Sequence, residues 1–262
     1  MYAFDFVRPS TIDEAVEALA AEEAQALGGG QTLIPTLKQR LAAPAVLVSL
    51  SGIDALKGVR AEGGVVHVGG GATHAEVAAG AAAAYPALAA LAGHIGDPAV
   101  RARGTIGGSL ANNDPSACYP AAVLASGATI VTNTREIAAD DYFAGMFTTA
   151  LEPGEIVTAV RFPVPQAANY QKFAQPASRF ALVGVFVARF ADGVRVAVTG
   201  ASEDGVFRWA EAEAALASNF TPEAVRGLKP GAEGMIEDMH GSAAYRAHLV
   251  GVLTGRAVAA AG

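Results

Sequence analysis

Two glycine-rich stretches carry the residues of this 262-residue sequence that are best suited to hold a ligand. Gly28 to Gly30 stand between a short apolar segment and a helical pattern, and Gly104, Gly107 and Gly108 form a second group. Glycine permits positive φ, and consecutive N–H groups without side chains form a nest for anionic oxygens. A helix start adds partial positive charge. These features predict a phosphate or pyrophosphate site; the alternative for Gly28 to Gly30 is a tight strand-to-helix turn.

The familiar nucleotide and hydrolase motifs do not fit these glycines. A G-x-G-x-x-G fingerprint would need glycine at position 33 or 74, where the chain has Leu33 and His74. A P-loop requires a Gly-Lys dipeptide, which is absent from the sequence. Gly107 to Ala111 is one residue short of a G-x-S-x-G nucleophile elbow. The sequence therefore argues against a Rossmann site, P-loop NTP hydrolysis and a serine hydrolase.

Composition narrows the function further. Hydrophobic residues make up 52% and charged residues 16%, which is typical of a soluble globular protein without a membrane segment. The N-terminus shows no secretory pattern, so we expect a cytoplasmic location. A net charge of −7 argues against nucleic acid as a partner. The single cysteine, Cys118, and five scattered histidines exclude an iron–sulfur cluster or a cysteine-based zinc site on this chain, and His74 with Glu76 is interpreted as a helix cap and first-turn acid.

The chain pattern places both glycine groups between regular elements. We predict a helix over 11–24, a strand over 25–27, a helix over about 32–41 and a strand over 46–50, which is a β-α-β unit with glycines at its first turn. Further predictions are a strand over 65–69, a helix over 120–126 and a strand over 128–132.

The pattern changes after residue 165, where Pro163 and Pro165 indicate a hinge between domains. Strands over 181–190 and 194–202 form a predicted hairpin, and helices are expected over 218–227 and around 242–259. We therefore divide the chain into residues 1–166, with subdomains of about 1–55 and 56–166, and residues 167–262.

Four motifs in register resemble the FAD-binding medium subunit of the xanthine dehydrogenase family, and especially that of aerobic carbon monoxide dehydrogenase and related molybdenum hydroxylases. They are GGGQTLIP from residue 28, GGGATHAEVA from residue 69, IGDPAVRARGTIGGSLANNDP from residue 95 and DYFAGMFTTALEPGEIV from residue 141. The resemblance covers essentially the whole chain. It implies an α+β fold: a vanillyl-alcohol-oxidase/PCMH-type FAD-binding domain of two subdomains, followed by a smaller α/β C-terminal domain.

The resemblance also implies which residues bind FAD. The first and second motifs of that family bind chiefly the diphosphate and ribityl, a third loop lines the flavin pocket, and an apolar pair and two second-domain residues approach the flavin. Carried over to this sequence, the set is Leu27, Gly28, Gly29, Gly30, Gln31, Thr32, Leu33, Gly71, Ala72, Thr73, Gly104, Thr105, Ile106, Gly107, Gly108, Ser109, Asp114, Cys118, Ile156, Val157, Lys172 and Phe180.

Two positions depart from the family pattern within the predicted pocket. Cys118 stands where many relatives carry an acid directed at the sugar chain of the flavin, so it is interpreted either as a pocket neighbour or as a small buried apolar residue. Arg179 stands where relatives often have an acid, and we expect it on the surface; pointing inward, it would favour anionic reduced flavin.

The function implied by the resemblance is electron transfer. FAD on this chain would accept electrons from two [2Fe-2S] clusters on a small subunit, which receive them from a molybdenum cofactor on a large subunit, and would pass them to NAD, quinone or oxygen. The family assembles as a dimer of heterotrimers. Two alternatives stay open: a stand-alone vanillyl-alcohol-type flavin oxidase, and a nucleotide-binding assembly subunit without flavin.

Overall fold

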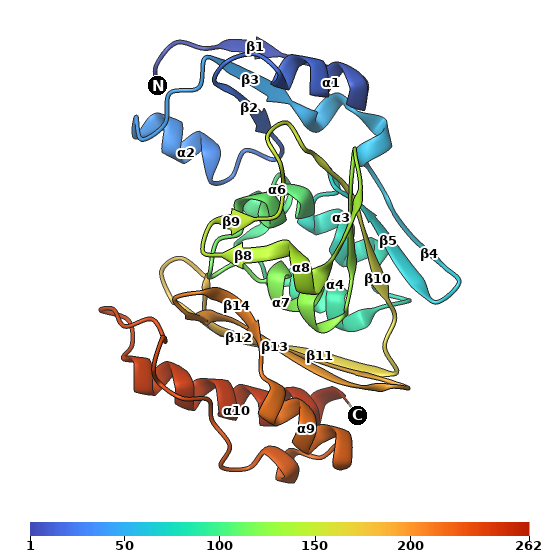
Figure 1. Cartoon of the computed structure of the whole chain (residues 1–262), viewed down its shortest axis with the longest axis vertical. Coiled ribbons are helices and arrows are strands. Elements are labelled where there is room, and N and C mark those ends of the chain that lie inside the picture. The colour runs from blue at the N-terminus through green and yellow to red at the C-terminus, as the bar shows by residue number, and fades with distance from the viewer. Residues whose placement is uncertain (262) are drawn as a thin grey trace.

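The computed structural model describes residues 1–261 and shows layers stacked along the long axis (Figure 1). A small N-terminal sheet with two helices lies at one end, a second sheet with several helices lies in the middle, and a third sheet backed by the C-terminal helix lies at the other end. The model is mixed α and β, as the sequence predicts.

The N-terminal layer confirms the predicted β-α-β unit. Strands pair in parallel in the order β1-β3-β2. Its elements are β1 (Asp5–Val7), α1 (Ile12–Leu19), β2 (Ala24–Leu27), α2 (Leu33–Lys38) and β3 (Val46–Ser49), followed by 3₁₀ turns at Leu50–Gly52 and Asp54–Leu56. Both predicted helices are too long at their C-terminal ends, because Glu23 and Arg40 adopt positive φ values that an α-helix does not permit. Strand β1 was not predicted.

The middle layer is an antiparallel sheet in the order β4-β5-β10-β6-β7. Its elements are β4 (Val59–Glu62), β5 (Val65–Gly69), α3 (His74–Gly80), α4 (Pro86–Gly93), α5 (Pro98–Arg101), α6 (Ile106–Asn112), α7 (Tyr119–Ala125), β6 (Thr129–Thr132), β7 (Glu136–Ala138), α8 (Ala139–Tyr142), β8 (Phe143–Gly145), β9 (Thr148–Thr149) and β10 (Val157–Pro163). The predicted strand over 65–69 is confirmed, and those for helix 120–126 and strand 128–132 are correct to one residue.

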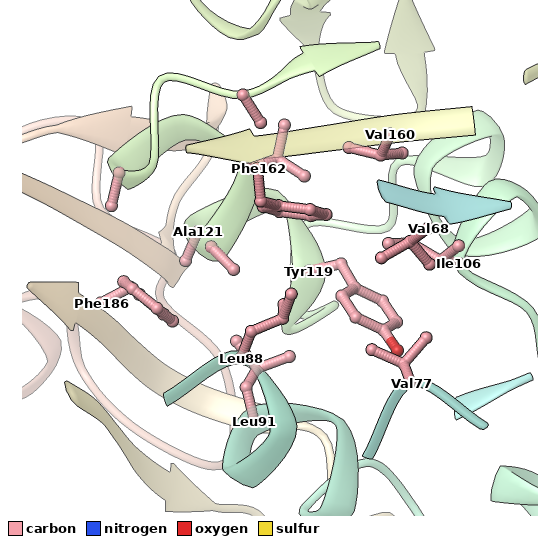
Figure 2. Packing of buried hydrophobic residues seen from close by; sticks show 14 of the residues in the cluster. Val68, Val77, Leu88, Leu91, Ile106, Tyr119, Ala121, Val160, Phe162 and Phe186 are labelled. Atoms are coloured by element: carbon pink, nitrogen blue, oxygen red, sulfur yellow. The ribbon is translucent and has the colours of Figure 1, made fainter. Parts of the chain in front are cut away.

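The main hydrophobic core lies between this sheet and its helices. Figure 2 shows Phe162 and Val160 from β10 directed toward Tyr119 and Ala121 of α7, with Leu88 of α4 nearby. These side chains are fully buried. Burial of apolar side chains on this scale is the dominant favourable term in folding.

The last layer is an antiparallel sheet in the order β11-β12-β13-β14. Its elements are β11 (Ala167–Ala174), β12 (Ala181–Phe190), β13 (Gly193–Ser202), β14 (Gly205–Arg208), α9 (Ala210–Ser218), a 3₁₀ turn at Pro222–Val225 and α10 (Ala243–Ala261). The hairpin is confirmed, with Phe190 paired to Gly193. The helix predicted over 218–227 is wrong: α9 ends at its first residue, and only the 3₁₀ turn forms beyond, beginning at Pro222, which lacks an N–H donor.

Both faces of the last sheet are buried. Phe186, Ala188 and Ala197 join the core of the middle layer. Val183, Val185 and other alternating residues instead pack with α9 and α10 in a second core. Pro163 is the last residue of β10, and residues 164–166 link the sheets. In this link, Val164 N donates to the Gly64 carbonyl and Gln166 N donates to the Arg189 carbonyl. The link is thus a short hydrogen-bonded connection, and the domain division near residue 166 stays a prediction.

Candidate FAD site

The first glycine loop, residues 28–31, follows β2 and contains backbone N–H groups that form no hydrogen bond within the described residues. Among residues 1–261, no backbone hydrogen bond is donated by Gly29, Gly30 or Gln31. Gly30 has φ +60°, a left-handed conformation that glycine adopts without steric cost. A Cβ on Gly29 would overlap the carbonyl oxygen of Arg103. The loop therefore needs glycine both for its backbone shape and for close packing, and it retains free donors, as expected of an anion nest.

The second glycine loop, residues 104–109, uses its N–H groups within the protein. Ile106 N donates to the Ala72 carbonyl at 3.1 Å, and Gly107 N donates to the Gly70 carbonyl at 2.9 Å. Gly108 N donates to Oγ1 of Thr105, the N-cap of α6, at 3.1 Å. These three groups have no donor left for a diphosphate. The binding of FAD by these residues stays a prediction, and it depends on the shape of the loop and not on these three N–H groups.

A third loop, residues 69–73, contains the glycines Gly69, Gly70 and Gly71, which pack against other loops. Gly71 N donates to the Leu56 carbonyl at 2.7 Å, and Thr73 forms an isolated bridge with Thr105. A Cβ on Gly107 would lie 2.5 Å from the Gly70 oxygen, and one on Gly69 would overlap the backbone of Leu56. Thr73 and Glu76 form a capping box at the start of α3, which confirms Glu76 as the first-turn acid; the cap predicted at His74 is wrong by one residue, because Thr73 is the N-cap and His74 is the first helical residue. Glycine here lets the backbones of separate loops touch.

Two cavities lie on either side of the contact between the first and second loops. One, of about 510 Å³, reaches Lys172 and is called the Lys172 cavity; the other, of about 430 Å³, reaches Ile156 and is called the Ile156 cavity. Both are lined by Gly28, Gly29, Thr105 and Gly108. A Cβ on Gly108 would meet only Thr105 Oγ1, at 2.9 Å. Gly108 therefore presents an open face at the junction of the cavities.

Nineteen of the 22 predicted residues line one cavity or both. The Lys172 cavity is lined by Gly28, Gly29, Gly30, Gln31, Thr32, Leu33, Gly104, Thr105, Gly108, Ser109, Asp114, Cys118, Lys172 and Phe180. The Ile156 cavity adds Gly71, Thr73, Gly107, Ile156 and Val157. Leu27, Ala72 and Ile106 line neither, and Ala72 and Ile106 are fully buried core residues. The apolar pair Ile156 and Val157 thus lies apart from Lys172 and Phe180.

Burial shifts the pKa values of two side chains that line the Lys172 cavity. Desolvation, with a smaller contribution from Arg101, lowers the pKa of His74 to about 4. Desolvation raises the pKa of Asp114, and the hydrogen bond from Ser116 N opposes the shift. His74 was not predicted as a lining residue; its place directly after the Thr73 cap is the sequence signal that locates it. Arg179 is exposed and has φ +62°, and it stands at the rim of this cavity.

The last sheet supplies part of the cavity wall. Thr199 of β13 is fully buried, and its Oγ1 lies 2.9 Å from the carbonyl oxygen of Pro115 and 2.7 Å from that of Ala117. Gly200 N donates to the Pro115 carbonyl at 2.7 Å. On the far side, Arg246 of α10 donates to the Gly200 carbonyl at 2.8 Å. The segment 114–118, which lines the Lys172 cavity, is therefore held by residues from outside the first 166.

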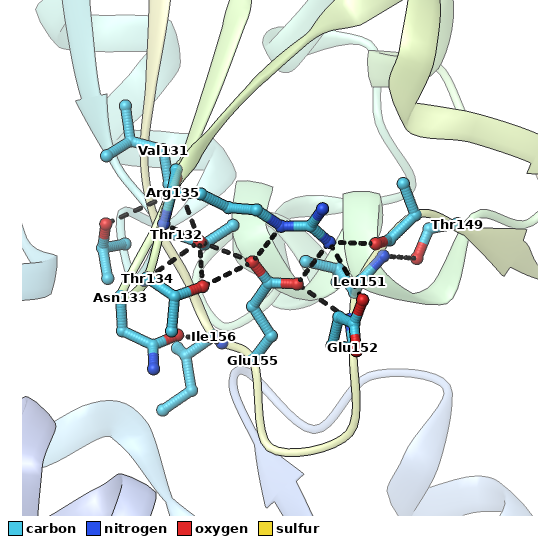
Figure 3. A network of polar contacts seen from close by, with 12 residues as sticks. Val131, Thr132, Asn133, Thr134, Arg135, Thr149, Leu151, Glu152, Glu155 and Ile156 are labelled. Atoms are coloured by element: carbon cyan, nitrogen blue, oxygen red, sulfur yellow. Dashed lines mark hydrogen bonds and ion pairs between the residues drawn. The ribbon is translucent and has the colours of Figure 1, made fainter.

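A polar network fixes the wall of the Ile156 cavity (Figure 3). Glu155 accepts hydrogen bonds from Arg135, Thr132 and Thr134, and these contacts, Arg135 first, lower its pKa to about 2. The next residue, Ile156, receives a hydrogen bond on its carbonyl from Asn133 N and donates its N–H to Asn133 Oδ1 at 2.7 Å. Ile156 also packs in the core of the N-terminal layer. The network thus joins two layers at the cavity.

Lys172 and Cys118 meet inside the Lys172 cavity. Lys172 Nζ lies 3.4 Å from Cys118 Sγ and donates to the His94 carbonyl at 3.1 Å. Cys118 is 5% exposed. Both interpretations of Cys118 therefore hold together, since it is a small buried side chain and also a neighbour of the pocket.

The comparisons with known proteins agree with this geometry. Residues 2–165 match the model of the family described as the FAD binding domain in molybdopterin dehydrogenase. The nicotine 6-hydroxylase medium subunit of Paenarthrobacter nicotinovorans is 36% identical, with 99% of this chain and 98% of that protein covered. The carbon monoxide dehydrogenase medium chain of Afipia carboxidovorans is also 36% identical, over 98% and 96%.

Solved structures are similar over the whole chain. The Cu,Mo-CO dehydrogenase structure has a TM-score of 0.88 at 32% identity and covers 100% of this chain and 98% of that one. Quinoline 2-oxidoreductase from Pseudomonas putida 86 has a TM-score of 0.88 at 29% identity, with 99% and 96% covered. Within residues 1–261, no helix has the length and apolar character to cross a membrane. The chain belongs to the family of FAD-binding medium subunits of molybdenum hydroxylases, which are oxidoreductases.

Proposed function

We propose that the chain holds one FAD across the two cavities and serves as the electron-transfer subunit of a molybdenum hydroxylase. The observation that carries the proposal is the first glycine loop: the N–H groups of Gly29, Gly30 and Gln31 have no backbone acceptor, Gly29 lines both cavities, and Gly30 and Gln31 line the Lys172 cavity. Free donors at that point suit a diphosphate that joins two bulky ends. The cavities on either side are then available for the adenosine and for the isoalloxazine.

The lining residues support one orientation of FAD. The lining of the Ile156 cavity includes Ile156, Leu50 and Leu56, which give it an apolar part suited to the adenine ring. The Lys172 cavity combines the ring of Phe180 with polar groups of Asp114 and Lys172, which suits the isoalloxazine and ribityl. Bound FAD supplies one- and two-electron redox chemistry, and the chain's residues orient it and limit the access of water.

The assembly and route of electrons extend this proposal. The chain receives electrons from two [2Fe-2S] clusters on a small subunit, which are reduced by a molybdenum cofactor on a large subunit, and delivers them to quinone, NAD or oxygen. A dimer of heterotrimers and a cytoplasmic location complete the proposal. It is supported by the family and by the medium-subunit relatives that match nearly all of the chain.

Purification of the chain alone tests the cofactor. We expect a yellow protein that releases FAD on denaturation, or an apoprotein that regains the flavin spectrum when FAD is added. A colourless protein that cannot be reconstituted would overturn the proposal. Oxidation of a small alcohol by the isolated chain would favour the stand-alone oxidase instead.

The electron route needs the complex. We expect co-expression with the large and small subunits to give a flavin that is bleached by the substrate of the large subunit. Complex stripped of FAD should still reduce its iron–sulfur clusters and should no longer reduce the external acceptor. Unchanged acceptor reduction without FAD would place the exit of electrons on another subunit.

A further inference from the structure

His74 is a buried polar side chain for which the fold supplies no hydrogen bond. It is 5% exposed and lines the Lys172 cavity. Neither ring nitrogen has a hydrogen-bond partner among residues 1–261, and Nδ1 is enclosed by protein atoms whereas Nε2 is not. Buried polar groups normally have a partner, and an unsatisfied one destabilises the fold. Packing alone therefore does not account for a histidine at this position.

Neighbouring residues hold the imidazole in place. His74 N donates to the Gly104 carbonyl at 2.9 Å, and the imidazole Nε2 would lie 2.5 Å from a Cβ on Gly104. The ring of Tyr119 lies 5.3 Å from the imidazole, measured between the two centroids. Gly104 is itself a lining residue of the Lys172 cavity. Nε2 is thus fixed at the cavity wall, beside the second glycine loop.

The place of His74 indicates which part of a bound cofactor it would meet. His74 lines the Lys172 cavity, which suits the isoalloxazine and ribityl, and it does not line the Ile156 cavity. Desolvation lowers the pKa of His74 to about 4, so the imidazole is neutral at pH 7. A neutral imidazole carries its proton on one nitrogen, and with the proton on Nε2 it is a hydrogen-bond donor toward the cavity.

We propose that His74 is a flavin-binding residue whose Nε2–H donates a hydrogen bond to the isoalloxazine in the Lys172 cavity. This inference rests on the proposed function, and it adds a residue that tunes the cofactor. The hydrogen bond that the imidazole lacks within the protein is then made to the cofactor. A donor at the flavin ring stabilises the negative charge that reduction places on it, so His74 favours the reduced cofactor and raises its potential.

The test measures FAD affinity and the reduction potential of the bound flavin in the full-length chain at pH 7. We expect His74→Phe, which keeps an aromatic ring, to bind FAD about fivefold more weakly, equivalent to about 1 kcal/mol. The potential of its flavin should be lower than in the original chain. The side-chain amide of His74→Gln can donate from about the place of Nε2, so this variant should restore both the affinity and the potential.

Tyr119→Phe is the matched control. The Tyr119 hydroxyl is also buried without a partner among the described residues, and its ring contacts the same imidazole, but Tyr119 lines neither cavity. We expect FAD affinity and flavin potential to be unchanged in this variant. Circular dichroism checks that each variant is folded.

Two outcomes would overturn the inference. One is a flavin potential in His74→Phe equal to that of the original chain, since a residue that only fills space would leave the potential unaltered. The other is an equal loss of affinity in His74→Phe and His74→Gln, which would trace the loss to side-chain shape. Either result leaves the FAD proposal intact, because the original chain still binds FAD. An original chain that binds no FAD would overturn the proposed function itself.

Discussion

The two glycine loops look alike in the sequence and differ in the structure. In the first loop, the N–H groups of Gly29, Gly30 and Gln31 donate no backbone hydrogen bond within residues 1–261 and are available to the proposed diphosphate. In residues 104–109 the N–H groups of Ile106, Gly107 and Gly108 are already paired inside the protein. The first loop therefore has hydrogen-bond donors available to a ligand, whereas the second contributes mainly the shape of the site. Glycine at a cofactor site can serve the ligand or the packing of neighbouring loops, and only the backbone partners tell which.

The largest expected effect on stability comes from a substitution at Gly107 of α6. Gly107→Ala places a Cβ 2.5 Å from the Gly70 carbonyl oxygen, and neither backbone can yield easily. We expect a loss of about 3 kcal/mol in the free energy of unfolding, as in severe overpacking. Urea unfolding measures it. If Gly107→Ala were as stable as the original chain, the second loop would not be tightly packed.

Acid should destabilise the fold at the second loop, through protonation of His74. The imidazole Nε2 would lie 2.5 Å from a Cβ on Gly104, so the ring fills the space beside that loop. Its pKa is lowered from 6.5 to about 4, so between these values the unfolded chain binds a proton that the folded chain does not. Stability is therefore intact above pH 6.5 and falls toward pH 4, by on the order of 3 kcal/mol in total.

Unfolding measured across that pH range checks the contribution of His74. His74→Phe keeps an aromatic ring beside Tyr119 and removes the titrating group. We expect its stability to fall less steeply between pH 6.5 and pH 4 than that of the original chain. Parallel curves would show that His74 does not carry the acid sensitivity.

Gly108→Val should change the shape of the FAD site more than the stability of the protein. Its Cβ meets only Thr105 Oγ1 and enters the junction of the cavities, unlike the Cβ of Gly107→Ala next to it. We expect FAD affinity to fall about 100-fold, or roughly 2.7 kcal/mol, with a smaller effect on unfolding. Flavin content and titration with FAD measure it. Full retention of FAD would show that the second loop does not shape the site.

A smaller effect is expected from Thr199, which acts on the site through segment 114–118. Thr199→Val keeps the volume and removes the hydroxyl that bonds the Pro115 and Ala117 carbonyls. We expect FAD affinity to fall about fivefold to tenfold, or about 1 kcal/mol. Thr254→Val is the matched control, since Thr254 is equally buried and bonds only its own helix, at Val250. Equal FAD affinity in both variants would contradict a role for the last sheet in the cavity.

The sequence alone determined the family, the fold class and most of the lining. Apolar periodicity placed the β-α-β unit and the hairpin, because these depend on side chains close together in the chain. Of the 22 residues that the resemblance predicted at the FAD site, 19 line one of the two cavities. It did not separate Ile156 and Val157 from Lys172 and Phe180, which lie in different cavities.

Only the tertiary structure decided which glycine N–H groups are free and what faces Cys118. The partners of the second loop, Ala72 and Gly70, lie more than 30 residues away in the chain, and those of segment 114–118 come from a different sheet. Lys172 reaches Cys118 across a sequence separation of 54 residues. A residue type states what a group can donate or accept, whereas its use depends on long-range packing that no local pattern contains.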